Sequence, residues 1–534
     1  MSKITSSCLL FLVALLIFSC AKRGNITGGL KDTLAPVLRE SEPKNFKTNF
    51  TGNEIKLSFD EYIKLKDINK QLIVSPPMNT APVITPTSSS KFISIKIKDT
   101  LLPNTTYSLN FGQSIQDNNE GNVYPQFKYV FSTGSTIDSL SISGTIEDAL
   151  ESKSDNFVTV MLYEINEKYT DSIVYKEKPR YVTNTLDSAS TFKIENIKAG
   201  KYQLIALKDK NNNFIYNPGK DKIAFHKEPI VIGPKNDNYI LQLFQEKPNF
   251  KSFKPSQVSG NRAILAYEGD ANKLKISLKN GSETLKTIVT QFPDRDTVQI
   301  WFPIVKTDSL EAIVTNGKYA KKHYFNLKNQ KKDSLSFSAK PTGILNFRQN
   351  FELTSSIPLT KFDKSKMSLV NSDSVAIDFT ADYDDFNQKL AFKWKKEPEE
   401  KYRITLLPGA LTDFYERTND TLQFKLATQV TSDYGNLLMR LENVKSYPII
   451  VQLTDAKGKV IDSEYLEKDP IATFNLIQPG TFIVRIIYDT NGNKKWDAGN
   501  FLEKTQSEEV IYFPKIIDVR ANWDVDQPFI LSPK

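Results

Sequence analysis

Apolar and polar residues alternate along most of the chain that follows Ala35. Three clear examples are residues 55–59, 93–98 and 107–111, in which every second side chain is Ile, Leu, Phe or Tyr. Successive side chains of a β-strand point to opposite faces, so this period of two predicts strands that are buried on one side. Turn residues such as those at 118–122 separate the segments at short intervals, and no long segment has a helical period. The pattern predicts an all-β fold, a multi-domain string of antiparallel β-sandwiches.

Length and composition agree with a folded chain of several domains. At about 100–150 residues per domain, 534 residues correspond to about four or five domains. Hydrophobic residues make up 39% of the chain, and its 22 Tyr and 33 Phe exclude a disordered polypeptide. The net charge of +8 is small for this length, so no nucleic-acid partner is expected.

The N-terminus has the pattern of an export signal. Lys3 precedes an apolar run of 11 residues, 8–18. A membrane-spanning helix needs about 20 apolar residues, so we expect a signal peptide over residues 1–19 instead. The segment 16–20, Leu-Ile-Phe-Ser-Cys, resembles the bacterial lipoprotein box, which implies that Cys20 carries palmitate-type chains and anchors the mature protein to the outer membrane. An ordinary signal peptide with an incidental cysteine is the alternative.

The cysteines and the residues after Cys20 refine this expectation. Cys8 and Cys20 are the only cysteines, and Cys8 leaves with the signal peptide, so the mature chain has no disulfide. Residues 20–34 then form a lipidated tether. In lipoproteins of Bacteroidota an acidic cluster after the cysteine resembles a surface-export signal, whereas Lys22 and Arg23 are basic. This departure favours the periplasmic face of the outer membrane, and the cell surface is the alternative.

Residues 35–134 contain the motifs of a known module. These motifs are Pro36, Glu42-Pro43, the strand 55–61, the stretch 101–107, Ile115-Gln116-Asp117, Gly121-Asn122 and Phe131-Ser132-Thr133. The set resembles a bacterial Ig-like domain of the S-layer-protein type. Asp117 and Asn122 suit a tight turn, and Tyr107 suits a corner position at which its hydroxyl bonds to the backbone. A ligand-binding role of Asp117 is the alternative.

Two segments further along the chain repeat each other. Residues 192–209 and 474–489 share an alternating strand, a glycine, a second apolar strand and an aspartate. The step from glycine to aspartate is the same in both. Both segments resemble the transthyretin-like or carboxypeptidase-regulatory-like sandwich. Residues 138–246 and 436–534 are therefore expected to be two copies of one module.

The chain between these copies predicts two more β-rich modules. Residues 250–340 contain alternating strands at 274–278 and 298–302 and are expected to form a β-sandwich of no assigned type. Residues 341–430 resemble a second, diverged Ig-like domain.

Each repeat ends in a loop rich in Asp and Asn. Oxygen-bearing side chains occupy loop positions 1, 3, 5 and 9, namely Asp209, Asn211, Asn213 and Asn217 in the first loop and Asp489, Asn491, Asn493 and Asp497 in the second. This spacing resembles an EF-hand-like calcium loop, because Ca²⁺ takes six or more oxygens. Ca²⁺ is thus a possible cofactor. The alternative is a pair of Asx turns in which these side chains bond to their own backbone.

Both loops depart from the calcium pattern. Phe214 and Lys494 replace the glycine of position 6, and Lys220 and Asn500 replace the glutamate of position 12. The second loop has two carboxylates among its spaced residues and the first has one, so tighter binding is expected at the second.

No catalytic constellation is visible in the sequence. The two histidines, His226 and His323, have no nucleophile placed beside them by any motif. Adjacent acids such as Asp60-Glu61 and Asp384-Asp385 would point to opposite faces of a strand, so they are poor acid/base pairs. The protein is therefore expected not to be an enzyme.

The four tryptophans, Trp301, Trp394, Trp496 and Trp523, could form a platform for sugars, but single tryptophans in alternating strands usually belong to a core. Trp496 lies in the second Asx-rich loop and is expected to fold over its own hairpin.

These patterns predict a non-catalytic lipoprotein of the Bacteroidota type that acts as a structural or interaction scaffold in the cell envelope with an envelope protein partner. A surface adhesin or array of glycan-binding modules is the second hypothesis, and it predicts an exposed row of aromatic residues. The third hypothesis is a hydrolase with an inter-module cleft lined by convergent acids.

Overall fold

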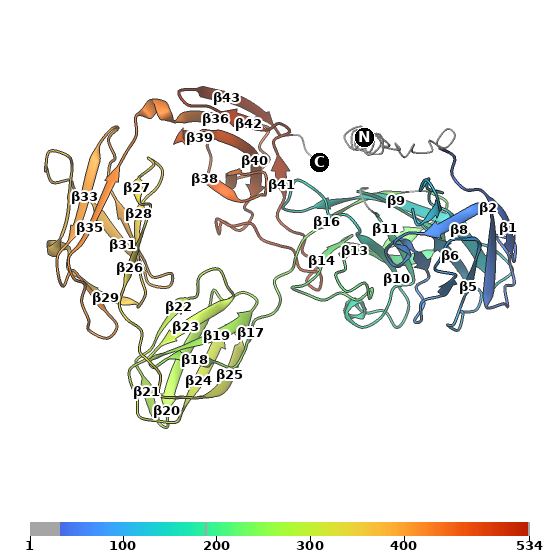
Figure 1. Ribbon diagram of the computed structural model, residues 1–534, viewed down its shortest axis with the longest axis horizontal. Coiled ribbons are helices and arrows are strands. Elements are labelled where there is room, and N and C mark those ends of the chain that lie inside the picture. Colours follow the sequence, from blue (N-terminus) through green and yellow to red (C-terminus); the bar gives the residue numbers. More distant parts are fainter. Residues whose placement is uncertain (1–31, 187–189, 236, 532–534) are drawn as a thin grey trace, which may run out of the picture. The chain divides into compact units, whose positions relative to one another are not determined.

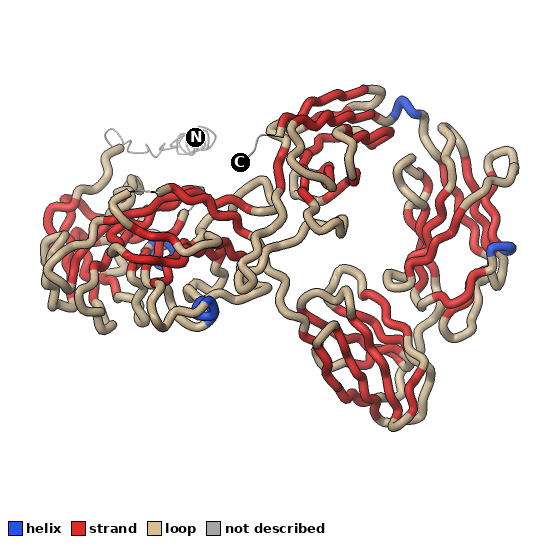
Figure 2. Tube along the Cα trace, turned by 180° about the vertical axis from the view of Figure 1, so that it is seen from behind, coloured by secondary structure: helices blue, strands red, loops and turns tan. Residues whose placement is uncertain are grey.

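A computed structural model describes residues 32–186, 190–235 and 237–531. Nearly every regular element in these ranges is a β-strand, as Figures 1 and 2 show. The helical segments are the four-residue α2 (Ile68–Gln71) and the short 3₁₀ turns η1 (Asp171–Tyr175), η2 (Lys364–Lys366) and η3 (Thr431–Asp433). The predicted fold class is confirmed. The signal peptide and Cys20 lie outside the described residues.

Within the described ranges, no helix is long and apolar enough to cross a membrane. The chain divides into two compact units, one that ends at Ser139 and one that begins at Leu140, and each is described by itself.

The first unit is a sandwich of two antiparallel sheets. One sheet contains, in pairing order, β1 (Leu38–Glu42), β2 (Glu54–Leu65), β5 (Ser90–Lys96) and β4 (Val83–Thr85), with β7 (Ile115–Asp117) also paired to β2; the other contains β3 (Ile73–Ser75), β6 (Thr106–Asn110) and β8 (Lys128–Ser132). The alternating residues predicted to face inward, such as Ile55, Leu57 and Leu109, are fully buried in one core.

The two predicted repeats have the same topology. In the first, one sheet contains β11 (Tyr181–Asn184), β10 (Thr159–Glu164), β13 (Gly200–Lys208) and β14 (Lys222–Phe225) with β15 (Ile230–Ile232) on β13, and the other contains β12 (Thr191–Ile197), β9 (Leu140–Asp148) and β16 (Asn238–Leu243). In the second, one sheet contains β38 (Val460–Leu466), β37 (Ile449–Thr454), β40 (Gly480–Tyr488) and β41 (Val510–Tyr512) with β42 (Ile517–Val519) on β40, and the other contains β39 (Ile471–Ile477), β36 (Gly435–Glu442) and β43 (Asp524–Ile530). Even the parallel pairing of the last strand with the first, β16 with β9 and β43 with β36, recurs.

The module after the first repeat is also a two-sheet sandwich. One sheet contains β17 (Lys251–Ser252), β19 (Arg262–Glu268), β23 (Thr297–Trp301) and β22 (Ile288–Gln291) with β18 (Ser256–Ser259) on β19, and the other contains β21 (Glu283–Leu285), β20 (Leu274–Asn280), β24 (Ser309–Asn316) and β25 (Tyr319–Asn326).

The next module has the strand order of the first unit. Its sheets are β26 (Phe337–Lys340), β28 (Phe351–Ser355), β32 (Lys389–Lys393) and β31 (Thr380–Asp384); then β27 (Gly343–Ile344), β35 (Leu422–Ala427), β33 (Lys401–Leu406) and β30 (Met367–Val370); and the pair β29 (Leu359–Phe362) and β34 (Leu411–Asp413). The predicted boundary between residues 340 and 341 leaves β26 in the preceding module, whereas β26 pairs with β28. The sequence of a single strand does not show which of two neighbouring sandwiches the strand belongs to.

The corner of the first and fourth modules is built in the same way. The Tyr107 hydroxyl accepts the N–H of Leu102 at 2.8 Å, and the Tyr402 hydroxyl accepts that of Glu397 at 2.7 Å. The predicted corner role of Tyr107 is thus seen directly, and it recurs in the second copy. Asp117 accepts three main-chain N–H groups of its own turn, from residues 120, 121 and 122, in agreement with the predicted turn role.

Candidate functional site

The two Asx-rich loops begin at the end of the long central strand of each repeat. Asp209 follows β13 and Asp489 follows β40, and both carboxylates are buried. Phe214 and Lys494, which stand where a calcium loop has glycine, have φ values of 61° and 63°. Both loops therefore keep the left-handed backbone of that position without the residue that favours it.

The second loop brings its spaced side chains together. The side-chain amides of Asn491 and Asn493 each lie 2.6 Å from Oδ2 of Asp497. Asp489 accepts the N–H of Asn493 at 3.1 Å and that of Lys494 at 2.8 Å, which curls the loop around its carboxylate. The amide oxygens of Asn491 and Asn493 accept the N–H groups of Asn493 and Lys495 at 3.0 and 2.8 Å, so it is their nitrogens that face Asp497. Asp489 and Asp497 supply the carboxylates that Ca²⁺ prefers. No group of three or more His, Cys, Asp or Glu side chains suited to a metal occurs in the described part of the chain, so the amides would have to contribute.

The first loop also uses its side chains on its own backbone. Oδ1 of Asn213 accepts the N–H of Ile215 at 2.9 Å, and the Asn217 amide donates to the carbonyl of Ile215 at 2.8 Å. Burial raises the pKa of Asp209, although N–H groups from Phe214 and other loop residues oppose this shift. This loop has the Asx-turn arrangement that was the alternative to calcium.

A buried acid from outside each loop holds it closed. Asp221 accepts the N–H groups of Lys210 and Asn217, at loop positions 2 and 9, at 3.0 and 2.9 Å. Glu508 accepts the N–H groups at the same two positions of the second loop, at 2.7 and 3.1 Å. The sequence does not reveal that Asp221 and Glu508 play the same role, because the two acids lie at different distances along the chain from their loops.

One of the two histidines has a serine beside it that no sequence motif indicates. Nε2 of His323 lies 2.8 Å from Oγ of Ser252, and the Tyr319 hydroxyl lies 2.9 Å from the same oxygen. The two residues are 71 positions apart, so no motif could reveal the pair. Ser252 is only 1% exposed and His323 7%, and burial lowers the pKa of His323. The pair lies inside the sandwich, where it ties β17 to β25, and the serine is not presented to a substrate.

A cleft of about 960 Å³ lies in the second unit. Its walls are residues 217–220, 245–248, 267–272 and 274, with Asp296 and Phe386. Two of the four acids in these walls are engaged in the fold: Glu246 accepts hydrogen bonds from the Tyr216 hydroxyl and the Phe501 N–H, and Asp270 accepts from Asn272.

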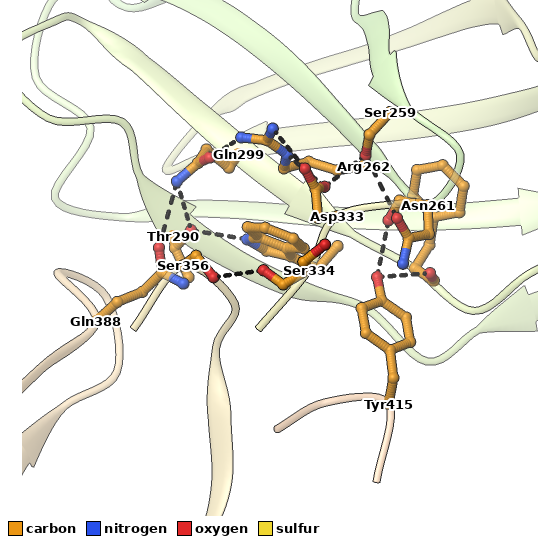
Figure 3. A network of polar contacts seen from close by, with 12 residues as sticks. Ser259, Asn261, Arg262, Thr290, Gln299, Asp333, Ser334, Ser356, Gln388 and Tyr415 are labelled. Atoms are coloured by element: carbon orange, nitrogen blue, oxygen red, sulfur yellow. Dashed lines mark hydrogen bonds and ion pairs between the residues drawn. The ribbon is translucent and has the colours of Figure 1, made fainter. Parts of the chain in front are cut away.

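The third and fourth modules meet at a buried joint, shown in Figure 3. Trp301 of β23 is fully buried there, against Ile357 and Phe414 of the following module. Its indole N–H donates to Thr290 at 2.9 Å, and the Arg262 guanidinium lies over its ring at 5.1 Å. Trp301 belongs to a core, as expected, and two modules together form that core.

Polar contacts lock the same joint. The Tyr415 hydroxyl lies 2.9 Å from the Asn261 carbonyl and 3.1 Å from that of Phe302. Asp333 pairs with Arg262 at 3.0 Å, and Arg417 donates to the Asp333 carbonyl at 2.9 Å. These contacts tie the third module to the fourth directly, through Tyr415, and through Asp333 of the segment between them.

The sequence contained a signal for this joint that was missed. Asp413 ends β34 as Asp117 ends β7, so the turns that follow them are equivalent in the first and fourth modules. The first turn continues with the polar pair 118–119, Asn-Asn, and the second with the aromatic pair 414–415, Phe-Tyr. Aromatic residues in a turn that is polar in the other copy indicate a surface covered by a neighbour.

The two repeats also contact each other within the second unit. Leu150 of the first packs on a patch of the second that contains Ile450, Ile487 and Trp496. The carbonyl of Leu150 accepts hydrogen bonds from Arg485, at 3.1 Å, and from the Tyr512 hydroxyl.

The segment after the second Asx-rich loop completes this contact. Phe501 is fully buried, with its ring 5.2 Å from that of Phe225, and its N–H donates to Glu246. Lys504 forms an ion pair with Asp171 at 2.7 Å. The second repeat is therefore docked on the first by residues that continue directly from its candidate calcium loop.

The other tryptophans differ in exposure. Trp394 is buried in the core of the fourth module, and the indole of Trp496 donates to the Glu508 carbonyl of its own hairpin at 3.1 Å. Trp523 is 52% exposed, with the Arg520 guanidinium 4.9 Å from its ring centre.

Comparison with protein families assigns one part of the chain to a domain family. Residues 32–133 match the bacterial Ig-like domain. The first module is therefore a bacterial Ig-like domain, and the fourth shares its strand order. A comparison with curated protein sequences gave no match.

Solved structures give remote likenesses. The chain is similar to domains 1–6 of the surface-layer protein SbsC, at 11% identity and a TM-score of 0.14, over 91% of this chain and 67% of that one. It is similar to BcpA, the major pilin subunit of Bacillus cereus, at 10% identity and 0.15, over 73% and 99%. It is also similar to SGBP-B of the Bacteroides ovatus mixed-linkage glucan utilization locus, at 10% identity and 0.18, over 71% and 94%. Likenesses at these TM-scores carry no argument about ligand or activity.

Proposed function

We propose that this protein is a non-catalytic scaffold of the cell envelope, anchored through lipid on Cys20 to the periplasmic face of the outer membrane. The observation that carries the scaffold role is the joint between the third and fourth modules. Trp301 and Tyr415 bury aromatic surface and pair polar groups between the two modules. A joint of this kind holds interaction surfaces at fixed positions, which is what a scaffold requires.

The anchor and the compartment rest on the sequence. The segment that ends at Cys20 resembles a lipoprotein box, and the basic residues after it favour the periplasmic face in a cell of the Bacteroidota type. An envelope protein is the expected partner. Ca²⁺ at the second Asx-rich loop would be structural, because the loop adjoins the contact between the two repeats.

A surface adhesin or glycan-binding array is the second candidate, and Trp523 favours it. This tryptophan is half exposed and stacked beside Arg520, as an aromatic platform for sugars would be.

Protease digestion of intact cells separates the two candidates. The proposal predicts that proteinase K leaves the protein whole in intact cells and degrades it once the outer membrane is permeabilised. Cross-linking before detergent extraction should then recover an envelope protein together with it. Digestion in intact cells would overturn the periplasmic scaffold and support the surface array.

A further inference from the structure

One sheet face of the fourth module carries unpaired positive charge. Lys401 and Arg403 lie two residues apart on β33, so their side chains share a face. Lys425 of β35 stands directly opposite Arg403. All three are exposed, whereas their neighbours Tyr402 and Leu426 are buried.

Like charges opposite each other on adjacent strands destabilise a sheet. No ion pair joins Lys401, Arg403 or Lys425 to any acid among the described residues. The other sheet of the same module is arranged differently. There Lys389 pairs with Glu352 at 3.4 Å and Lys393 with Asp382 at 2.8 Å.

The unpaired charges form the floor of a groove of about 490 Å³. Asn371, Ser372 and Ser374 line one wall, and Gly343 and Ile344 of the edge strand β27 line the other. Glu400, the nearest acid in sequence, accepts the N–H groups of Ser372 and Lys401 and so holds the wall in place. The volume is in the range of about 300–1,000 Å³ that is usual for ligand sites.

The groove combines this charge with an apolar contact. Ile344 is 51% exposed, and the ring of Tyr402, the aromatic residue in the lining, is buried in the core. An exposed aliphatic side chain without an exposed aromatic ring suits a peptide better than a sugar. The edge position of β27 also leaves main-chain groups for an extended peptide.

We propose that this groove binds an extended acidic segment of a partner protein, with carboxylates on Lys401, Arg403 and Lys425 and an apolar side chain on Ile344. The inference rests on the proposed scaffold function and gives the chemistry of one of its partners. The like charges of Arg403 and Lys425 weaken the sheet, and the complementary charge of an acidic segment explains why they are present.

Fluorescence anisotropy with the purified full chain tests this groove. The probe is a labelled octapeptide of alternating glutamate and valine, and a glutamine–valine octapeptide is its neutral counterpart. The groove variant is Lys401→Gln/Arg403→Gln/Lys425→Gln. The control variant, Lys389→Gln/Lys393→Gln/Lys395→Gln, removes the same charge from elsewhere in the module. We expect the acidic peptide to bind the groove variant about tenfold more weakly than the control variant.

Equal loss of binding in both variants, or equal binding of the neutral peptide, would overturn the proposal. So would selective binding of phosphatidylglycerol vesicles or oligogalacturonate in place of the peptide. Lys425→Glu provides a second readout, because it creates an opposite-charge pair with Arg403. It should raise the melting temperature and abolish peptide binding, and a lowered melting temperature would contradict the unpaired charge. These measurements are made in vitro and do not depend on the lipid anchor or the compartment. The peptide-binding proposal and the proposed scaffold function can therefore fail separately.

Discussion

The hydroxyl of Tyr415 lies 2.9 Å from the carbonyl oxygen of Asn261, although the two residues are 154 positions apart and belong to different sandwiches. Asn261 is buried, and Tyr415 packs on the shared cluster around Trp301. Removal of this single hydroxyl therefore tests the docking of the third and fourth modules.

Tyr415→Phe should weaken this joint while keeping the ring. It leaves the carbonyls of Asn261 and Phe302 without this donor, which should lower the free energy of unfolding by about 1–2 kcal/mol. Differential scanning calorimetry of the full chain measures the change. Tyr324→Phe is the control, because Tyr324 is exposed and bonds only to Glu311, and it should change stability by less than about 0.5 kcal/mol. Equal effects would show that the joint does not depend on Tyr415.

Phe501→Ala should separate the two repeats. Phe501 is fully buried against Phe225, and loss of a buried phenylalanine usually costs about 3–5 kcal/mol. We expect faster limited proteolysis of the segment around residue 501 and a lower melting temperature. Leu502→Ala changes the next residue, which is 53% exposed, and should behave like the unaltered protein. A Phe501 variant that resists protease equally well would contradict the docking of the repeats.

Acid should weaken the first module through Asp117. Burial raises the pKa of Asp117, but the N–H groups of Gly121, Asn122 and Glu120 outweigh it and leave the pKa lowered. The stabilisation is therefore present above the unfolded-state pKa of about 4 and is lost as the pH falls through the lower folded-state pKa.

Asp117→Asn should accordingly cost about 1–2 kcal/mol at pH 7, and the difference from the unaltered protein should vanish at strongly acidic pH. The tryptophans all lie in the second unit, so tryptophan fluorescence does not report on the first module. Calorimetry over a pH series is therefore the suitable measurement. Glu120→Gln removes one exposed charge from the same turn and should show no such pH dependence. A constant difference at all pH values would argue against the charged form of Asp117.

Calcium should act on the second Asx-rich loop and not on the first. Asp489 and Asp497 give the second loop two carboxylates, and the amides of Asn491 and Asn493 converge on Asp497. Asp209 is the one carboxylate among the spaced residues of the first loop. We expect Ca²⁺ to raise the melting temperature relative to chelator, by mass action on the folded state. Asp497→Ala should abolish the increase and Asn213→Ala should leave it intact. An identical melting temperature with metal and with chelator would exclude both loops.

The sequence alone predicted those parts of the fold that depend on local pattern. Alternation located β2, β5 and β6, and a matched glycine-to-aspartate step identified two repeats whose strand order is the same. The loop residues were predicted too, because Asx spacing is local. Their geometry was not, since an acid outside each loop, Asp221 or Glu508, decides how it closes.

The parts that the sequence did not predict are contacts between distant segments. Alternation shows that Trp301 faces inward, but it cannot show that a second module covers it. The Ser252–His323 pair likewise depends on the pairing of whole strands. The most useful signal was a difference between equivalent turns, Phe414-Tyr415 in place of Asn118-Asn119, and it becomes visible once the first and fourth modules are aligned.

The anchor is the basis of the proposed function, and mass spectrometry of the mature N-terminus tests it most directly. The protein extracted from native membranes with detergent should begin at Cys20 and carry diacylglycerol on the sulfur. A Cys20→Ala variant should take up no labelled palmitate and should leave the membrane fraction. A mature chain that begins upstream of Cys20, an unmodified cysteine, or palmitate retained by the variant would contradict a lipid-anchored scaffold.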